Sequence, residues 1–169
     1  MAGTAEVLKR IRRTPMSNIR YSVLVPNQRG LKMFLDIDEI KKPHPLVNEI
    51  AVFTATTDGF AQNNLNCTVA ESLKKLESVT RNALKEGLRV RGYLSMVIAC
   101  PFEGKTDPKR VRELTKELFD MGCYEVSLGD TVGQGRPHEV AEMLEEVKKD
   151  NPVDKLAVSF YFHLSMFSK

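Results

Sequence analysis

The sequence predicts an α/β protein in which about five parallel strands, separated by helices, form part of a (βα) barrel. Strand-like and helix-like apolar patterns alternate along the chain, and two predicted helices stop at equivalent points, Gly87 and Gly122. Strands separated by helices pair in parallel through right-handed crossovers. A doubly wound open sheet also fits this alternation, but no GxGxxG motif follows the first strand, as a dinucleotide-binding sheet would require.

Runs of β-branched and other apolar residues predict the strands. In chain order they are residues 21–25, 49–53, 89–96 and 124–128, and a last strand that starts at residues 155–158. The first strand stops at Pro26, and the fourth leads into a glycine-containing loop. The region between the first two strands is less regular, and residues 41–45 are expected to form a surface loop.

Three helices follow from their start signals. Thr68 opens the first, because Glu71 three residues later completes a capping box that satisfies orphan amides of the first turn. Asp107 caps the second, with proline at its first position, and Pro137 opens the third. Each helix carries an apolar stripe, and the three stripes are Leu73, Leu76, Val79 and Ala83; Val111, Leu114, Leu118 and Phe119; and Val140, Met143, Leu144 and Val147.

Alternation along two strands favours the barrel over the open sheet. Residues two apart in a strand face the same side. One face therefore collects polar groups, and the other collects small or apolar ones. The polar set is Arg91, Tyr93, Ser95, Glu125 and Ser127, and the opposite set is Gly92, Leu94, Met96, Val126 and Leu128. The apolar set is expected to pack on the helices, and the polar set to line the barrel toward its carboxyl end, where active sites of such barrels form.

Composition is that of one ordinary globular domain. The chain has 169 residues, of which 42% are apolar and 28% charged. A net charge of +3 is too small to indicate nucleic-acid binding, and the basic run at residues 9–13 is read as a solvated helix face. No apolar run reaches the ~20 residues of a membrane span, and no signal peptide or mitochondrial presequence is recognised. The three widely spaced cysteines predict reduced intracellular thiols.

Several runs of residues together resemble the hydroxymethylglutaryl-CoA lyases, metal-dependent (βα)8-barrel enzymes. The runs are YSVLVPN at 21–27, NLNC at 64–67, RGYLS at 91–95, CPFEGK at 100–105 and MGCYEVSLGDTVG at 121–133. SLGDT alone would suggest only the broader class that includes isopropylmalate and homocitrate synthases. The combination with RGYLS and CPFEGK is more specific, and the resemblance runs from about residue 1 to residue 158.

The resemblance implies a partial TIM (βα)8 barrel. Residues 1–158 would be the central part of the domain, and residues 159–169 a divergent tail. The implied reaction cleaves 3-hydroxy-3-methylglutaryl-CoA to acetyl-CoA and acetoacetate, a step of leucine breakdown and ketone-body formation. The implied partners are an acyl-CoA substrate and Mg²⁺ or Mn²⁺, with the mitochondrial matrix as the implied location.

Departures from the family pattern fall at the positions that bind the metal. The chain begins after the family's second strand, so the first-strand Asp ligand and its neighbouring Arg are not matched. Ser159 and Tyr161 stand where the family has two histidine ligands, and His163 lies two residues further on. The family's catalytic Cys loop is not matched either. We therefore expect this chain to bind no metal ion by itself and to be catalytically inactive as given.

Candidate site residues follow from parity and from the resemblance. Asp130 ends a strand and is either a catalytic residue or a turn residue that caps the next helix. Tyr93 and Ser127 face the barrel interior, either as filling or as contacts to substrate. Further candidates for substrate binding are Asn27, Thr57, Ser95 and Thr131. Cys100 is read as a small buried residue, and His44 and His138 as surface residues.

Two other functions remain open on sequence alone. Five strands do not close an eight-stranded barrel, which typically spans ~250 residues. The edges at residues 21–25 and 156–160 would then be exposed and could pair with another chain, so a non-catalytic fragment that self-associates is one alternative. A related condensing barrel of the isopropylmalate or homocitrate synthase type is the other.

Overall fold

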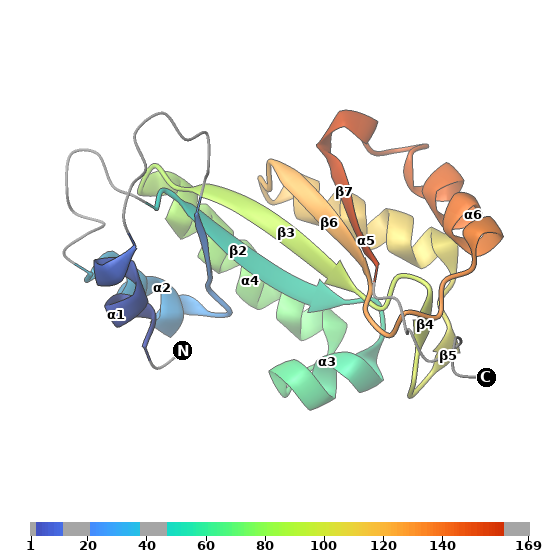
Figure 1. Ribbon diagram of the computed structural model, residues 1–169, viewed down its shortest axis with the longest axis horizontal. Coiled ribbons are helices and arrows are strands. Elements are labelled where there is room, and N and C mark those ends of the chain that lie inside the picture. The colour runs from blue at the N-terminus through green and yellow to red at the C-terminus, as the bar shows by residue number, and fades with distance from the viewer. Residues whose placement is uncertain (1–2, 12–20, 38–46, 161–169) are drawn as a thin grey trace, which may run out of the picture.

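A parallel sheet forms the centre of the molecule in the computed structural model, which describes residues 3–11, 21–37 and 47–160 (Figure 1). Its strands lie in chain order as β1 (Ser22–Leu24), β2 (Glu49–Ala55), β3 (Arg89–Ser95), β6 (Glu125–Asp130) and β7 (Leu156–Phe160). Every neighbouring pair is parallel. The prediction of five parallel strands in chain order is confirmed.

Helices connect the strands, and a short hairpin lies after β3. The helices are α1 (Thr4–Arg10), α2 (Gln28–Leu35), α3 (Asp58–Leu65), α4 (Val69–Lys85), α5 (Pro108–Asp120) and α6 (Pro137–Val147), with a 3-10 turn η1 (Val153–Lys155) before β7. The hairpin pairs β4 (Ala99–Cys100) with β5 (Gly104–Lys105) in antiparallel fashion. Sequence patterns predicted α4, α5 and α6 but not α3 or the hairpin. The expected loop at residues 41–45 lies outside the described residues.

The predicted helix ends are confirmed by their hydrogen bonds. At the start of α4, the Thr68 hydroxyl accepts from the Glu71 amide at 3.2 Å, and the Glu71 carboxylate accepts from the Thr68 amide at 2.9 Å. The Asp107 carboxylate accepts from the Lys109 amide at 2.9 Å at the start of α5. Gly87 and Gly122 follow α4 and α5 with φ of 74° and 107°, values that favour glycine.

The sheet has one apolar face and one polar face. Val90, Leu94, Val126 and Leu128 are buried in the core cluster with the apolar stripes of α4 and α5. Burial of side chains of this size stabilises a fold by about 1.5–3 kcal/mol each. In the described part of the chain, the strand residues of this cluster all come from the same face. Helices on a single face are the arrangement of a barrel wall, so the predicted strand parity is confirmed.

Among the residues that the structure describes, no helix is long and apolar enough to cross a membrane.

Candidate active site

The predicted polar residues of β3 and β6 lie on the sheet face opposite the core. Tyr93 pairs in register with Ser127, and Ser95 pairs with Gly129 one step nearer the carboxyl end. Ser127 is buried and Tyr93 is half-buried. The structure therefore brings Tyr93 and Ser127 together side by side, with Ser95 and the end of β6 just beyond them.

A charged pair that the sequence patterns did not single out fixes Tyr93. Arg91 donates from Nη1 to the Tyr93 hydroxyl at 3.1 Å, and its Nη2 pairs with the Glu125 carboxylate at 2.5 Å. Parity had placed Arg91 and Glu125 on this face, but their pairing depends on the exact register of β3 against β6. The guanidinium thus ties the two strands together and orients the phenol.

A second polar group lies nearer the amino ends of the strands. The Tyr124 hydroxyl donates to the Glu49 carboxylate at 2.8 Å, and the Arg89 guanidinium lies 3.8 Å from the centre of the Tyr124 ring. Burial is the main cause that raises the pKa of the Tyr124 hydroxyl, and the hydrogen bond to Glu49 raises this pKa further. This phenol therefore stays protonated and serves as a fixed hydrogen-bond donor between β6 and β2.

Asp130 is buried at the carboxyl end of β6 and holds the loop that follows. Its two carboxylate oxygens accept from the Gln134 amide at 3.2 Å and from the Gly135 amide at 2.8 Å. A Cβ at position 135 would lie 2.8 Å from the carboxylate, so glycine is required for this close approach. These bonds favour the turn interpretation of Asp130, and its catalytic role stays a prediction.

Two threonine candidates have hydroxyl groups that are already engaged. Thr57 donates to the Cys100 sulfur at 3.1 Å, and the Thr131 hydroxyl accepts from the Met96 amide at 3.1 Å. Met96 has a φ of 63°, a conformation that is unusual for a non-glycine residue, and the bond from Thr131 helps to hold it. Both threonines position loops at the carboxyl end of the sheet, and their contact with substrate stays a prediction.

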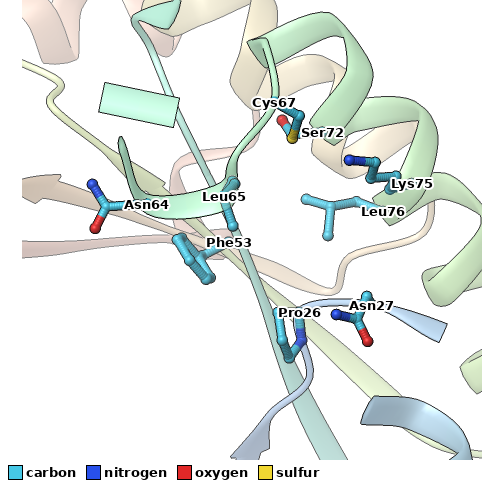
Figure 2. Close-up of a pocket in the computed structure, with 9 residues that line it drawn as sticks. All are labelled: Pro26, Asn27, Phe53, Asn64, Leu65, Cys67, Ser72, Lys75 and Leu76. Atoms are coloured by element: carbon cyan, nitrogen blue, oxygen red, sulfur yellow. The ribbon is translucent and has the colours of Figure 1, made fainter. Parts of the chain in front are cut away.

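Asn27 lies apart from these residues, beside a hollow of about 410 Å³ at the carboxyl ends of β1 and β2 (Figure 2). Its side chain caps α2 by accepting from the Gly30 amide at 2.9 Å. Apolar and polar groups from β2, α3 and α4 share the lining, among them Phe53, Asn64, Leu65, Lys75 and Leu76. Sequence reasoning did not name Lys75 or Asn64 as site residues, because neither belongs to a periodic pattern or follows a strand. Asn64 appeared only in the NLNC run that carries part of the resemblance.

The described residues do not fit a divalent cation. Among them, no three His, Cys, Asp or Glu side chains gather closely enough to hold a metal ion. Ser159 is exposed on β7, and a serine hydroxyl is a poor substitute for an imidazole ligand. Tyr161 and His163 lie outside the described part of the chain. The possible metal ligands among the described residues are therefore too far apart to bind one ion together.

Cys100 was expected to be a small buried residue and His138 a surface residue, and the structure agrees with both expectations. Cys100 is buried and accepts from Thr57 and from the Phe102 amide. Burial raises the pKa of the Cys123 thiol to about 12. His138 is exposed at the start of α6, and His44 lies outside the described residues.

Together the parallel strands in chain order, the helices on one face and the polar opposite face define the wall of a (βα)8 barrel. The chain belongs to the HMGL-like family, whose model matches residues 2–166. It is 42% identical to the cytoplasmic 3-hydroxy-3-methylglutaryl-CoA lyase of Danio rerio and 42% identical to the mitochondrial hydroxymethylglutaryl-CoA lyase of Bos taurus, in each case over 94% of this chain.

Solved structures show the same relationship. The HMG-CoA lyase of Brucella melitensis is 42% identical and matches 95% of this chain with a TM-score of 0.85, and that of Pseudomonas aeruginosa is 40% identical with a TM-score of 0.84. The chain spans 44% and 46% of the two curated relatives, and 53% and 50% of the two crystallised lyases. It therefore corresponds to about half of each of these relatives.

Proposed function

We propose that the protein to which this chain belongs cleaves 3-hydroxy-3-methylglutaryl-CoA to acetyl-CoA and acetoacetate. The observation that carries this proposal is the relationship to HMG-CoA lyases at about 40% identity over nearly the whole chain. The relatives named above also favour a lyase over a condensing barrel of the isopropylmalate synthase type.

The proposed reaction is a retro-Claisen cleavage. A base takes the proton of the C3 hydroxyl, the C2–C3 bond breaks, and its electron pair passes to the enolate of acetyl-CoA, which is then protonated. We assign to Tyr93, Ser95 and Ser127 hydrogen bonds to the substrate, because they share the open polar face. Asp130, which ends β6 on the side of Val126 and Leu128 and not on that polar face, is the proposed acid–base residue. The family is generally metal-dependent, but the described residues support no step through Mg²⁺ or Mn²⁺.

We further propose that the hollow beside Asn27 takes part of the acyl-CoA. Phe53, Leu65 and Leu76 offer apolar contact to an alkyl chain, and Asn64 offers amide hydrogen bonds. Lys75 adds an ammonium group that can pair with a phosphate. Asn27, at the start of α2, would border such a ligand. Thr57 does not line this hollow, and its contact with substrate stays a prediction.

The test compares two adjacent lysines on α4. Lys75 lines the hollow and Lys74 does not, although both are exposed. We expect Lys75→Met to raise the Kd for CoA roughly fivefold, because an exposed ion pair contributes up to about 1 kcal/mol. Lys74→Met removes the same charge and should leave the Kd unchanged. Equal effects of the two variants, measured by calorimetry, would place the ligand elsewhere.

Location and assembly are proposals of the same kind. The relatives include cytoplasmic and mitochondrial proteins, and we propose the mitochondrial matrix. Imaging of the tagged protein in its own cells tests this, and a diffuse cytosolic signal would contradict it. An alternative function, a non-catalytic chain that pairs with another copy, is favoured by apolar side chains along the two sheet edges, at Leu24, Val158 and Phe160.

A further inference from the structure

Helix α3 forms one wall of the hollow, yet it has little apolar anchorage. Asn64 and Leu65 at its carboxyl end contribute to the lining. Ala61 is the one buried residue among the eight of α3. A short helix with so little buried surface is weakly held by packing alone, so its position must depend on other contacts.

Two polar contacts at the amino end of α3 supply this anchorage. Asp58 accepts from the Val69 amide at 2.7 Å and so joins α3 to the start of α4. The Glu103 carboxylate accepts from the Gly59 amide at 2.6 Å. Glu103 belongs to the tip of the β4–β5 hairpin, which is more than forty residues away in the sequence. A carboxylate at a helix amino end is favoured both by the free amides and by the helix dipole.

Phe102, next to Glu103, packs directly on the helix backbone. A Cβ at position 59 would lie only 2.9 Å from the Phe102 Cβ and 3.0 Å from the Glu103 carboxylate. The glycine therefore allows the hairpin tip to approach α3 closely. Phe102 remains 57% exposed, so its ring is not held by burial in the core and this contact is its visible structural role.

The hairpin itself is firmly attached to the sheet. The hydroxyls of Thr56 and Thr106 both donate to the Met96 carbonyl, at 2.7 and 2.6 Å. Thr57, at the start of α3, donates to Cys100 of β4. The hairpin is thus fixed at its base to the ends of β2 and β3, and its tip reaches across to α3.

We propose that Glu103 and Phe102 are positioning residues for the hollow: they fix the amino end of α3 and thereby set the place of Asn64 and Leu65 against the ligand. The inference rests on the proposed function in that the ligand of the hollow is an acyl-CoA. It adds a specific role for the hairpin tip, which contacts α3 at Gly59.

The experiment measures hydrogen exchange of residues 58–65 and the Kd for CoA in parallel, on the full chain. We expect Glu103→Ala to speed exchange in α3 roughly tenfold and to raise the Kd by a similar factor, because a charge-assisted hydrogen bond is worth about that much. Glu103→Gln keeps an acceptor oxygen and should restore most of both values. Lys105→Ala lies on the same hairpin but points to Glu139 and Glu142, and should change neither.

Gly59→Ala provides an independent test that leaves Glu103 in place. Alanine raises helix propensity, so faster exchange in α3 would come from the clash with Phe102 and Glu103 at the hairpin tip and not from a weaker helix. Unchanged exchange in both Glu103→Ala and Gly59→Ala would overturn the proposal, as would faster exchange with an unchanged Kd. If the wild-type chain does not bind CoA at all, the acyl-CoA assignment fails, and the exchange of residues 58–65 alone then decides whether the hairpin tip positions α3.

Discussion

Individual polar side chains at the carboxyl end of this sheet are engaged in holding the backbone. Asp130 accepts from two amides of its own loop, and Thr131 accepts from the amide of Met96. Such bonds pre-organise a site, because the groups that face a ligand do not have to rearrange on binding. The same residues can therefore be required for activity through stability alone, and the two effects have to be separated by measurement.

Asp130→Asn measures the contribution of its hydrogen bonds to stability. The amide nitrogen of asparagine cannot accept, so one of the Gln134 and Gly135 amides loses its partner. We expect the free energy of unfolding in urea to fall by about 1–3 kcal/mol. Asp154→Asn makes the same charge change at an exposed position of η1 and should have no measurable effect. An Asp130→Asn variant as stable as wild type would show that these bonds do not hold the loop.

Cys123 gives a prediction for alkaline pH. Burial raises the pKa of its thiol from 9.0 to about 12, so the unfolded chain releases this proton at a lower pH than the folded one. The stability that results is fully present below pH 9 and is lost as the pH rises toward 12. Unfolding by urea at several pH values should show this decline, and Cys123→Ala should make it shallower. An identical pH dependence in the variant would rule out Cys123 as a source, leaving groups such as Tyr124.

The sequence predicted which side chains lie on the polar face of the sheet. It did not predict which of these side chains pair with one another. The alternation along β3 and β6 placed Tyr93, Ser127 and Arg91 on one side, as the structure confirms. The Arg91–Glu125 pair needs the strand register, which alternation does not supply. The engagement of Thr57 by Cys100 needs the β4–β5 hairpin, whose strands are too short to show a period.

At the scale of elements, helices with strong signals were predictable and α3 was not. The capping box of α4 and the proline starts of α5 and α6 act locally, so the sequence alone reveals them. Helix α3 has the sequence DGFAQNNL, in which few residues are apolar, and its start depends on groups far along the chain. It ends at Asn66, which has a φ of 52°, a position that asparagine tolerates better than most residues.

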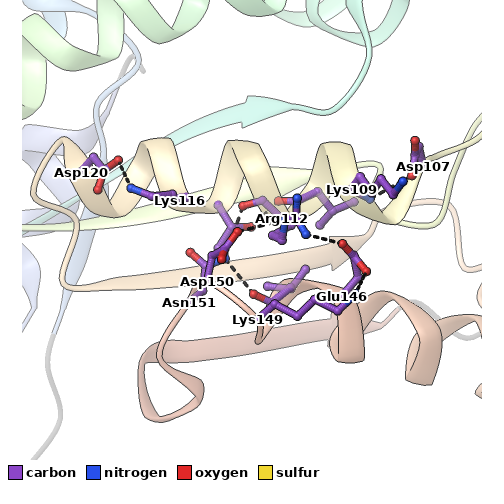
Figure 3. A network of polar contacts seen from close by, with 12 residues as sticks. Asp107, Lys109, Arg112, Lys116, Asp120, Glu146, Lys149, Asp150 and Asn151 are labelled. Carbon is purple, nitrogen blue, oxygen red and sulfur yellow. Dashed lines mark hydrogen bonds and ion pairs between the residues drawn. The ribbon is translucent and has the colours of Figure 1, made fainter.

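A charged cluster joins α5 to α6 and to the turn that follows α6 (Figure 3). Arg112 donates to Glu146 at 2.6 Å and lies 3.1 Å from Asp150, and its carbonyl accepts from Asn151. The Arg112 and Glu146 side chains are largely buried, so their pair is screened less than one on the open surface. The cluster therefore helps to fix the α6 layer against α5.

Arg112→Met tests this cluster, because methionine keeps the apolar stem and removes the charge. We expect a loss of about 1–2 kcal/mol in the free energy of unfolding, between the values for exposed and for buried pairs. Lys116→Met on the same helix breaks only the exposed pair with Asp120 and should leave stability nearly unchanged. Equal stability of the two variants would mean that the Arg112 cluster contributes no more than a surface pair.

At the scale of the whole molecule, β1 and β7 are the two edge strands of the sheet among the residues that the structure describes. Leu24 is 45% exposed on the first, and Val158 is 46% exposed on the second. Unpaired strand edges with apolar side chains tend to associate. This arrangement is that of a segment of a barrel wall, because a closed barrel of eight strands continues past both edges.

The isolated 169-residue chain is therefore expected to self-associate. Sedimentation at micromolar concentration should show dimers or larger species, and Val158→Lys should shift the distribution toward monomer by placing a charge on the β7 edge. Val153→Lys puts the same charge on an exposed apolar position of η1, which precedes β7 and is not part of the strand, and should not shift it. A wild-type chain that is monomeric throughout would contradict association through the edges.

The central proposal, that this chain forms the substrate-binding wall of an HMG-CoA lyase barrel, is tested most directly by a chimera. In the chimera, residues 3–158 of this chain replace the matching segment of the Brucella melitensis lyase. The lyase's own sequence then supplies everything before and after that segment, including the positions that correspond to Ser159 and beyond. We predict acetoacetate release from 3-hydroxy-3-methylglutaryl-CoA, a marked loss of it in Tyr93→Phe, and none from the 169-residue chain alone. A folded chimera that releases no acetoacetate, or turnover by the isolated chain, would contradict this account.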